Sequence, residues 1–271
     1  MEEFDLTGKA VVITGAGGVL CGTMAKKLAK AGARIAVLDL VKEAAEKVTD
    51  AIKAEGGEGI AVKCNVLEKG SLEAAKKEVN NAFGKIDILV NGAGGNKKEA
   101  TTSPELQFFD MPVDAIRFVF ELNFIGTLLP SQVFGKEMAG NDGGVILNIS
   151  SMNAFRPLTK IAAYSAAKAA INNFTQWLAV HMCQNFSKNI RVNAIAPGFF
   201  LTEQNRFLLT EEKSGKLTAR GKTIVEHTPM GRFGEPGELV GTVLWLLSDA
   251  AKFVTGVVVP VDGGFSAFSG V

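Results

Sequence analysis

The chain has 271 residues, of which 47% are hydrophobic and 21% are charged, and its formal net charge is +1. This composition is typical of a folded domain with a sizeable core, and it excludes a disordered or fibrous protein. The balanced charge lacks the basic excess of a nucleic-acid-binding protein, and no apolar run approaches the ~20 residues that span a bilayer.

Short β-branched runs alternate with longer amphipathic runs along the whole chain. The short runs are apolar on both faces, as in strands of a parallel sheet that helices cover on both sides. The predicted strands are Ala10–Thr14, Arg34–Asp39, Gly59–Asn65, Ile86–Asn91, Val145–Ser150, Ile190–Ile195 and Val257–Val261. The predicted helices are Ala25–Ala31, Lys42–Glu55, Leu72–Phe83, Val113–Met138, Ala163–Phe186 and Glu238–Leu247. This alternation predicts one Rossmann-like α/β domain over residues 1–271, a doubly wound parallel seven-stranded sheet with helices on both faces.

A glycine-rich turn follows the first predicted strand and reads Thr14-Gly15-Ala16-Gly17-Gly18-Val19-Leu20. Such a turn lets backbone amides at a helix N-terminus approach a pyrophosphate, and the helix dipole favours the negative charge. Leu20 stands where the pattern G-x-G-x-x-G has its third glycine, so a tight strand-to-helix turn without a ligand is the alternative. No G-x-x-x-x-G-K-[ST] motif occurs, which disfavours P-loop phosphoryl transfer.

The second predicted strand ends at Asp39, roughly 20 residues after the glycine turn, the spacing typical of a ribose-binding carboxylate. A carboxylate there can accept both ribose hydroxyls of NAD, and it repels the 2′-phosphate of NADP. Leu40 and Val41 follow, so no basic residue stands beside it. We therefore expect NAD rather than NADP, while the alternative is that Asp39 only caps the helix that starts at Lys42.

The chain has 18 Phe but one Tyr, which suggests that Tyr164 is present for its hydroxyl group. Lys168 stands four residues later on the same helix face, so its ammonium is expected to lower the phenol pKa from about 10. Ser151, at the end of the fifth strand, can bind a carbonyl oxygen on which negative charge develops. These three residues predict a general acid–base site, whereas an isolated Y-x-x-x-K is usually a pair on a helix surface.

Together these motifs resemble the short-chain dehydrogenase/reductase family, over nearly the whole chain. Further matching motifs are Asn91-Gly92-Ala93-Gly94, Asn123, Pro197-Gly198, Thr202 and Asp262-Gly263-Gly264. The resemblance implies NAD(P)-dependent hydride transfer between an alcohol and a carbonyl. It implies that Tyr164 exchanges the hydroxyl proton and that Ser151 orients the carbonyl. It also implies that Lys168 binds the nicotinamide ribose and tunes Tyr164, and that Asn123 supports a water in a proton relay.

The resemblance also implies a set of cofactor contacts around the glycine turn and the strand ends. These residues are Gly15, Gly17, Gly18, Val19, Leu20, Asp39, Asn65, Val66, Asn91, Ala93, Tyr164, Lys168, Pro197, Gly198, Phe200 and Thr202. Two motifs depart from the family pattern. Val19 and Cys21 stand where the family turn T-G-x-x-x-G-x-G has glycines, and Gly92 replaces the second Asn of Asn-Asn-Ala-Gly. The Cβ of Val19 is expected to crowd a pyrophosphate unless the loop is built around Gly17 and Gly18.

Amides and cations are frequent in the loops after the fourth, fifth and sixth strands. Such loops suit a polyhydroxylated, anionic substrate better than a steroid or an acyl chain, because Arg and Lys bind carboxylates. The candidate substrate-binding residues are Asn96, Asn153, Arg156, Lys160 and Arg206. The alternative for each cation is an ordinary solvated loop charge. Residues 197–235 are long and irregular, and they are predicted to form a lid over the site.

Within the family, the motifs are similar to those of the sugar-acid branch. This likeness implies reduction of D-fructuronate by NADH to D-mannonate. The alternatives are another aldonate or polyol dehydrogenase, such as a gluconate 5-dehydrogenase, or a non-catalytic NAD(H)-binding sensor. The family also implies a homotetramer, with the long helix Ala163–Phe186 and the C-terminal segment in the contacts.

The remaining expectations concern metals and location. His181 and His227 stand alone, and Cys21, Cys64 and Cys183 are far apart, so neither a metal site nor a disulfide framework is expected. The acidic first residues do not read as a secretory signal. We therefore expect a cytoplasmic protein with no nucleic-acid or membrane partner.

Overall fold

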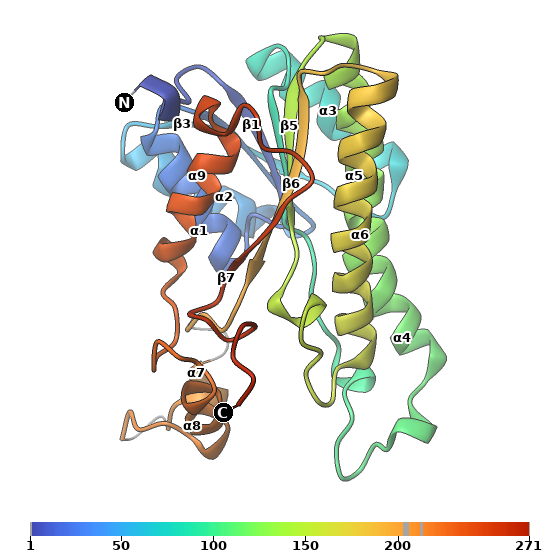
Figure 1. Ribbon diagram of the computed structural model, residues 1–271. Helices are drawn as coiled ribbons and strands as arrows, with labels where there is room; N and C mark the ends of the chain where they lie inside the picture. The colour runs from blue at the N-terminus through green and yellow to red at the C-terminus, as the bar shows by residue number, and fades with distance from the viewer. Residues whose placement is uncertain (1, 203–205, 212–213, 271) are drawn as a thin grey trace.

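A computed structural model describes residues 2–202, 206–211 and 214–270, and these form a three-layered α/β structure around a parallel sheet (Figure 1). The sheet has seven strands in the order β3-β2-β1-β4-β5-β6-β7, and every neighbouring pair is parallel. The strands are β1 Ala10–Thr14, β2 Arg34–Asp39, β3 Glu58–Lys63, β4 Ile88–Asn91, β5 Gly144–Ile149, β6 Ile190–Pro197 and β7 Val258–Val261. The predicted doubly wound, single-domain fold is confirmed.

Helices cover both faces of the sheet because its strands are apolar on both sides. The helices are α1 Val19–Lys30, α2 Lys42–Ala54, α3 Lys69–Phe83, α4 Val113–Phe120, α5 Gly126–Gly140, α6 Ala162–Asn185, α7 Arg206–Leu209, α8 Ala219–Glu226 and α9 Val240–Leu247. Buried side chains of α1, α2 and α9 pack in one core cluster, and those of α3, α5 and α6 pack in another. No helix in the described ranges is long and apolar enough to cross a bilayer.

The long helix predicted over Val113–Met138 is divided in the structure. After α4 the chain makes one π-helical turn, Glu121–Ile125, and then continues as α5. The apolar pattern runs through the break, so sequence periodicity does not reveal it. The π turn contains Asn123, whose side chain is bound to the backbone of a distant loop, and such turns are frequent at functional sites.

Several further boundaries differ from the sequence-based expectation, and those of two elements and one loop bear on the site. The first helix begins at Val19 rather than Ala25, directly after the glycine turn. The third strand ends at Lys63, so Asn65 follows it instead of belonging to it. The stretch 197–235, predicted to be irregular, contains the short helices α7 and α8.

Register brings the carboxyl ends of the central strands to one edge of the sheet. Thr14 of β1 pairs with Asn91 of β4, and Asn91 pairs with Asn148 of β5. The loops after these strands therefore leave the sheet side by side. In parallel α/β sheets this edge is where ligands bind.

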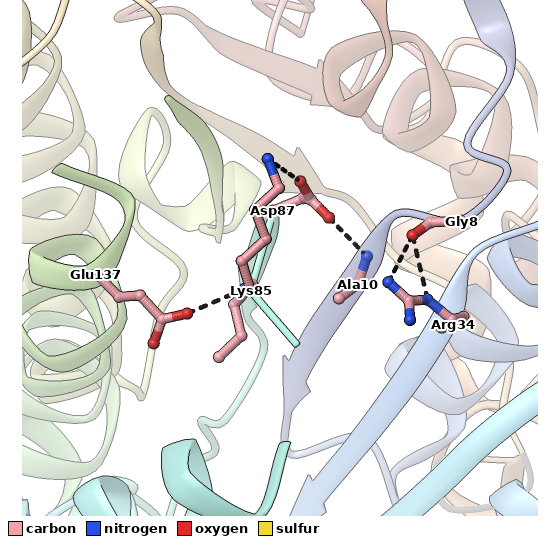
Figure 2. A network of polar contacts seen from close by, with 7 residues as sticks. Gly8, Ala10, Arg34, Lys85, Asp87 and Glu137 are labelled. Carbon is pink, nitrogen blue, oxygen red and sulfur yellow. Dashed lines mark hydrogen bonds and ion pairs between the residues drawn. The ribbon is translucent and has the colours of Figure 1, made fainter. Parts of the chain in front are cut away.

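A polar network ties the opposite edge of the sheet together (Figure 2). Just before β4, the Asp87 carboxylate accepts a hydrogen bond from the backbone amide of Ala10, 2.9 Å away. Glu137 of α5 accepts one from the amide of Ile86 at 3.0 Å. These bonds attach the entry of β4 to β1 and to α5.

Candidate active site

Ser151, Tyr164 and Lys168 lie together at the carboxyl edge of the sheet. Ser151 follows β5, and its hydroxyl accepts a hydrogen bond from the Asn153 amide at 3.3 Å. Tyr164 and Lys168 lie in the first two turns of α6. The Ser151 hydroxyl hydrogen-bonds to the Tyr164 phenol, and the Lys168 Nζ lies 5.5 Å from the centroid of the Tyr164 ring. The structure thus brings the three predicted catalytic side chains into one site.

Burial dominates the electrostatics of this group. Lys168 is 4% exposed, its Nζ donates to the Ile149 carbonyl at 2.8 Å, and burial lowers its pKa to about 8. Burial raises the pKa of Tyr164, while the hydrogen bond with Ser151 lowers it. The expectation that the Lys168 ammonium brings the pKa of the phenol below its ordinary value is therefore wrong for this structure, because desolvation is the larger effect on Tyr164.

Asn123 is fully buried behind Lys168 and acts as a clamp on the loop after β4. Its Nδ2 donates to the carbonyls of Gly95 and Val119, both at 2.7 Å, and its Oδ1 accepts from the Gly95 amide at 3.2 Å. A Cβ at Gly94 would lie 2.7 Å from the Asn123 Oδ1 and 3.3 Å from the Lys168 Nζ, so only glycine fits there. The predicted role of Asn123 in a proton relay stays a prediction.

The glycine turn has the geometry of an anion site. Gly18 is the N-cap of α1, and glycine has no side chain that could accept a hydrogen bond from the first amides of the helix. These amides can therefore bind an anion. Gly15 has a φ of +65°, and a Cβ there would lie 2.7 Å from the Cα of Ala93. Val19 and Leu20 open α1 with half-buried side chains. The turn is therefore built around Gly15, Gly17 and Gly18, and these residues fit a pyrophosphate.

Asp39 faces the glycine turn from the end of β2. Its Oδ2 accepts a hydrogen bond from the backbone amide of Gly17 at 2.9 Å, and its Oδ1 accepts one from the backbone amide of Val41 at 3.0 Å. The N-cap of α2 is Val41, so Asp39 is not the residue that caps this helix. A carboxylate beside the turn fits a ribose diol.

The other predicted cofactor residues divide into two groups. Asn65 and Val66 follow β3, and the Asn65 side chain bonds the amide of Leu67 at 3.1 Å and Glu68 at 2.8 Å. Pro197 ends β6, and Gly198, Phe200 and Thr202 follow it along the same edge. A Cβ at Gly198 would lie 2.6 Å from the Cα of Asp262, which explains a glycine there.

Asn91, which the family resemblance places at the adenosine side of the cofactor, has its side chain in the core. Its side chain is 1% exposed, and its Nδ2 donates to Ser131 and to Asn148, each at 2.9 Å. The amide thus joins β4 to α5 and β5 inside the core. The strand register turns this side chain inward, so a contact of Asn91 with a nucleotide would come from its backbone, and it stays a prediction.

The candidate substrate residues lie in the segments that follow β4, β5 and β6, but they differ in burial. Asn153 is 5% exposed, and its Oδ1 is buried with no hydrogen-bond partner among the described residues. Asn96 is exposed and donates to the hydroxyl of Thr101 at 2.8 Å. Lys160 is exposed and has a φ of +96°. Arg206 is exposed at the start of α7.

The C-terminal tail lies against both the catalytic loop and the predicted lid (Figure 1). Arg156, predicted to bind substrate, donates from its Nε to the carbonyl of Ser266 at 3.1 Å. The rings of Phe199 and Phe265 pack with centroids 5.3 Å apart. The sequence did not predict this contact between Arg156 and the tail, because no local pattern shows that the C-terminal residues pack against the catalytic loop. Within the predicted lid, Glu203, Gln204 and Asn205 lie outside the described residues.

Thr14 and Cys21 were not predicted as site residues. The buried Thr14 hydroxyl accepts hydrogen bonds from the amides of Gly92 and Ala93, at 3.1 and 3.2 Å. Cys21, in the first turn of α1, fills the space beside Gly92. The signal that could have found Cys21 was present in the sequence as the pair of departures at Cys21 and Gly92.

Comparisons with known proteins agree with this site. A family model described as enoyl-(acyl carrier protein) reductase matches residues 18–266. A relative from Haemophilus influenzae, named an uncharacterised oxidoreductase, is 54% identical and aligns over 98% of this chain and 96% of its own length. The 5-keto-D-gluconate 5-reductase of Escherichia coli is 33% identical, with 97% of each chain covered.

Two solved structures are similar over nearly their whole length. One, from Haemophilus influenza, is described as a candidate D-mannonate oxidoreductase with bound NAD; it is 53% identical, with a TM-score of 0.93 and 98% of each chain covered. The other is a gluconate 5-dehydrogenase of Burkholderia cenocepacia in complex with NADP and tartrate, 30% identical, with a TM-score of 0.87 and 98% coverage of both chains.

The chain therefore belongs to the short-chain dehydrogenase/reductase family. It is an oxidoreductase that acts on CH–OH groups with a pyridine nucleotide cofactor.

Proposed function

We propose that this protein is an NAD-dependent sugar-acid oxidoreductase and that it reduces D-fructuronate to D-mannonate. The main observation behind this proposal is that Ser151, Tyr164 and Lys168 lie together at the carboxyl edge of the sheet. The segments at the same edge contain the exposed residues Asn96, Lys160 and Arg206. Amides and cations suit an anionic, hydroxylated substrate. The similarity to a candidate D-mannonate oxidoreductase and to a 5-keto-D-gluconate reductase supports the same substrate class.

The cofactor would be held by three elements. The amino end of α1 and its glycines would bind the pyrophosphate, Asp39 the adenosine ribose, and Lys168 the nicotinamide ribose. When bound, the nicotinamide supplies the hydride that adds to the carbonyl carbon. NAD is favoured over NADP because a 2′-phosphate would meet the Asp39 carboxylate.

The protein's own residues handle the proton. Ser151 holds the substrate carbonyl oxygen by a hydrogen bond, which stabilises the negative charge that develops on it. Tyr164 donates its phenolic proton to that oxygen, so the product is an alcohol and the phenol is left as phenolate. The buried Lys168 ammonium stabilises the phenolate until a proton from solvent replaces the one lost. The raised pKa of Tyr164 keeps the phenol protonated before the reaction, as an acid must be.

The substrate would be enclosed by residues 197–235, which we propose act as a lid. Asn153 stands directly beside Ser151, and the C-terminal tail packs on both the lid and the catalytic loop. Glycines 263 and 264 pack against Thr228 and Pro229 of the lid. A lid that is joined to the catalytic loop through the C-terminal tail can exclude water from the reacting carbonyl.

A spectrophotometric assay tests the substrate. Purified protein is mixed with NADH and D-fructuronate, and cofactor oxidation is followed, with 5-keto-D-gluconate and a ketosteroid as comparison substrates. We expect the highest kcat/KM with D-fructuronate. A higher kcat/KM with 5-keto-D-gluconate would favour the alternative gluconate 5-dehydrogenase activity, and NADH binding without turnover of any carbonyl would favour a sensor.

We also propose a homotetramer in the cytoplasm. Trp177 and Val180 of α6 and Phe186 directly after it are each more than half exposed, and Phe253 near the C-terminal strand is fully exposed. Apolar side chains this exposed mark contact surfaces. Cys21, Cys64 and Cys183 are free thiols, which suits a reducing compartment.

A further inference from the structure

We infer that Cys21 and Gly92 form a steric pair that sets the spacing between the first turn of α1 and the loop after β4, and through it the affinity for the dinucleotide. The inference rests on the cofactor-binding part of the proposed function and not on the identity of the substrate. It assigns a positioning role to two residues that lie beneath the nucleotide cleft.

The first observation is that space, and not backbone conformation, requires glycine at position 92. Gly92 is not among the residues with a positive φ, so its backbone is open to other amino acids. A Cβ built on it would nevertheless collide with the Sγ of Cys21 and would lie 2.8 Å from the carbonyl oxygen of Thr14. The volume that a side chain would need is thus already filled by the cysteine.

The second observation is that the pair lies where the two walls of the cleft meet. Cys21 is the third residue of α1, whose amino end faces the anion site. Gly92 precedes Ala93, whose Cα lies within 2.7 Å of a Cβ built on Gly15. The backbone amides of Gly92 and Ala93 both donate hydrogen bonds to the Thr14 hydroxyl. A larger side chain at either position would therefore move the glycine turn away from Ala93.

The third observation is that Cys21 contributes shape and not reactivity. Its side chain is 5% exposed, and burial raises the pKa of its thiol to about 12. The thiol stays neutral at physiological pH and is shielded from reagents, so it is a poor nucleophile. Two of the three positions that depart from the family motifs, Cys21 and Gly92, are thus in contact in the structure, where volume added at Cys21 is matched by volume removed at Gly92.

A double-mutant cycle on NADH affinity tests the pair. The Kd for NADH is measured by fluorescence titration for wild type, Gly92→Ala, Cys21→Gly and the double variant, with the Tm of each. We expect Gly92→Ala to weaken binding by about tenfold in the wild-type background, and by no more than about threefold in the Cys21→Gly background. The residual loss reflects the Thr14 carbonyl, which the added Cβ still approaches. Gly70→Ala, where nothing lies within 4 Å, is the matched control and should bind as wild type does.

Two results would overturn the inference that Cys21 and Gly92 act as a pair. One is an equal loss of NADH affinity on Gly92→Ala in both backgrounds. The other is a lowered Tm for Gly92→Ala with an unchanged Kd, which would make the contact merely structural. If Gly92→Ala does not fold, the double variant decides, because it must then fold and bind NADH with a Kd within about threefold of that of Cys21→Gly. Failure of the proposed function has a different signature, namely a wild type that binds NADH but does not reduce D-fructuronate.

Discussion

The side chains of Tyr164 and Lys168 lose water on folding, and this loss changes how readily each gives up a proton. For the phenol, desolvation disfavours the anion, so the pKa rises. For the ammonium, desolvation disfavours the cation, so the pKa falls to about 8. The phenolate that forms during reduction would then compensate the buried Lys168 charge, which makes the two residues work as a unit.

Replacing the phenol tests the proton donor. Tyr164→Phe keeps the ring and removes the hydroxyl, so we expect turnover to fall on the order of 10²-fold or more, with little change in the Kd for NADH. Turnover is measured at saturating NADH and carbonyl substrate. Phe174→Tyr, a change at an aromatic residue of α6 remote from the reacting group, is the control. Near-wild-type turnover of Tyr164→Phe would contradict the assigned role.

The pH profile follows from Lys168. Since its pKa is about 8, the ammonium that stabilises the phenolate is lost as the pH rises through 8, so kcat for reduction should fall above that pH. The unfolded state holds this proton up to 10.5, so between 8 and 10.5 the group makes the free energy of unfolding rise with pH. Activity should thus fall while the protein stays folded. A kcat that remains constant well above pH 8 would argue against this assignment.

Cofactor choice depends on Asp39. Asp39→Ser removes the charge that repels a 2′-phosphate, so we expect the ratio of kcat/KM for NADH to that for NADPH to drop at least about tenfold. The affinity for NADH should fall as well, because the amide of Gly17 loses its acceptor. The exposed Asp114→Ser is the control for a lost carboxylate. An unchanged cofactor ratio in Asp39→Ser would mean that another residue sets the preference.

At the scale of elements, the site depends on how each strand is fixed at the end remote from it. The loop after β4 carries Ala93 and Gly94, and β4 itself has four residues, Ile88–Asn91. Asp87 and Glu137 secure its entry by hydrogen bonds to the amides of Ala10 and Ile86 (Figure 2). Strand β4 is short, and it is attached at its entry by Asp87 and Glu137 and in the core by Asn91. The loop that follows it therefore has little positional freedom.

Removing one of these attachments should lower stability without abolishing the fold. Asp87→Ala leaves the Ala10 amide without its acceptor, and we expect a loss of about 1.5–3 kcal/mol in the free energy of unfolding, the range for hydrogen bonds to charged groups. Chemical denaturation measures it. Asp114→Ala, which breaks an exposed ion pair with Arg117, should leave the denaturation midpoint unchanged. Equal midpoints for wild type and Asp87→Ala would show that water replaces the carboxylate.

At the scale of the whole molecule, one outer face carries a broad apolar surface. Between α5 and α6 lies a groove of about 700 Å³, lined mainly by apolar side chains that include Phe174, Trp177 and Leu178. The rings of Trp177 and His181 stack at 4.6 Å and extend this surface along α6. A face of this kind is typical of subunit contacts.

Light scattering coupled to size exclusion tests the proposed assembly. We expect the wild type to elute with four times the mass of the chain. Val180→Glu places a charge on the exposed face of α6 and should give smaller species with the same helical content by circular dichroism. Lys222→Glu on α8 is the control for the change of charge. A monomeric wild type would contradict the homotetramer.

Local patterns in the sequence were sufficient for much of this protein. The alternation of β-branched and amphipathic runs determined the doubly wound sheet, because strand and helix periodicities are properties of consecutive residues. Spacing along one helix placed Tyr164 and Lys168 on a common face, and the position of Asp39 at a strand end placed it beside the glycine turn. Each of these features involves one element or two neighbouring ones.

Only the tertiary structure decided the features that depend on segments distant in the chain. The inward turn of Asn91, the clamp of Asn123 on Gly95, and the contact of Cys21 with Gly92 each require strands and helices to be packed first. The sign of the shift in the pKa of Tyr164 belongs here too, because it reflects the water that the whole fold removes from the phenol. Burial and contact between distant residues are properties of the packed chain, and no local run of amino acids encodes them.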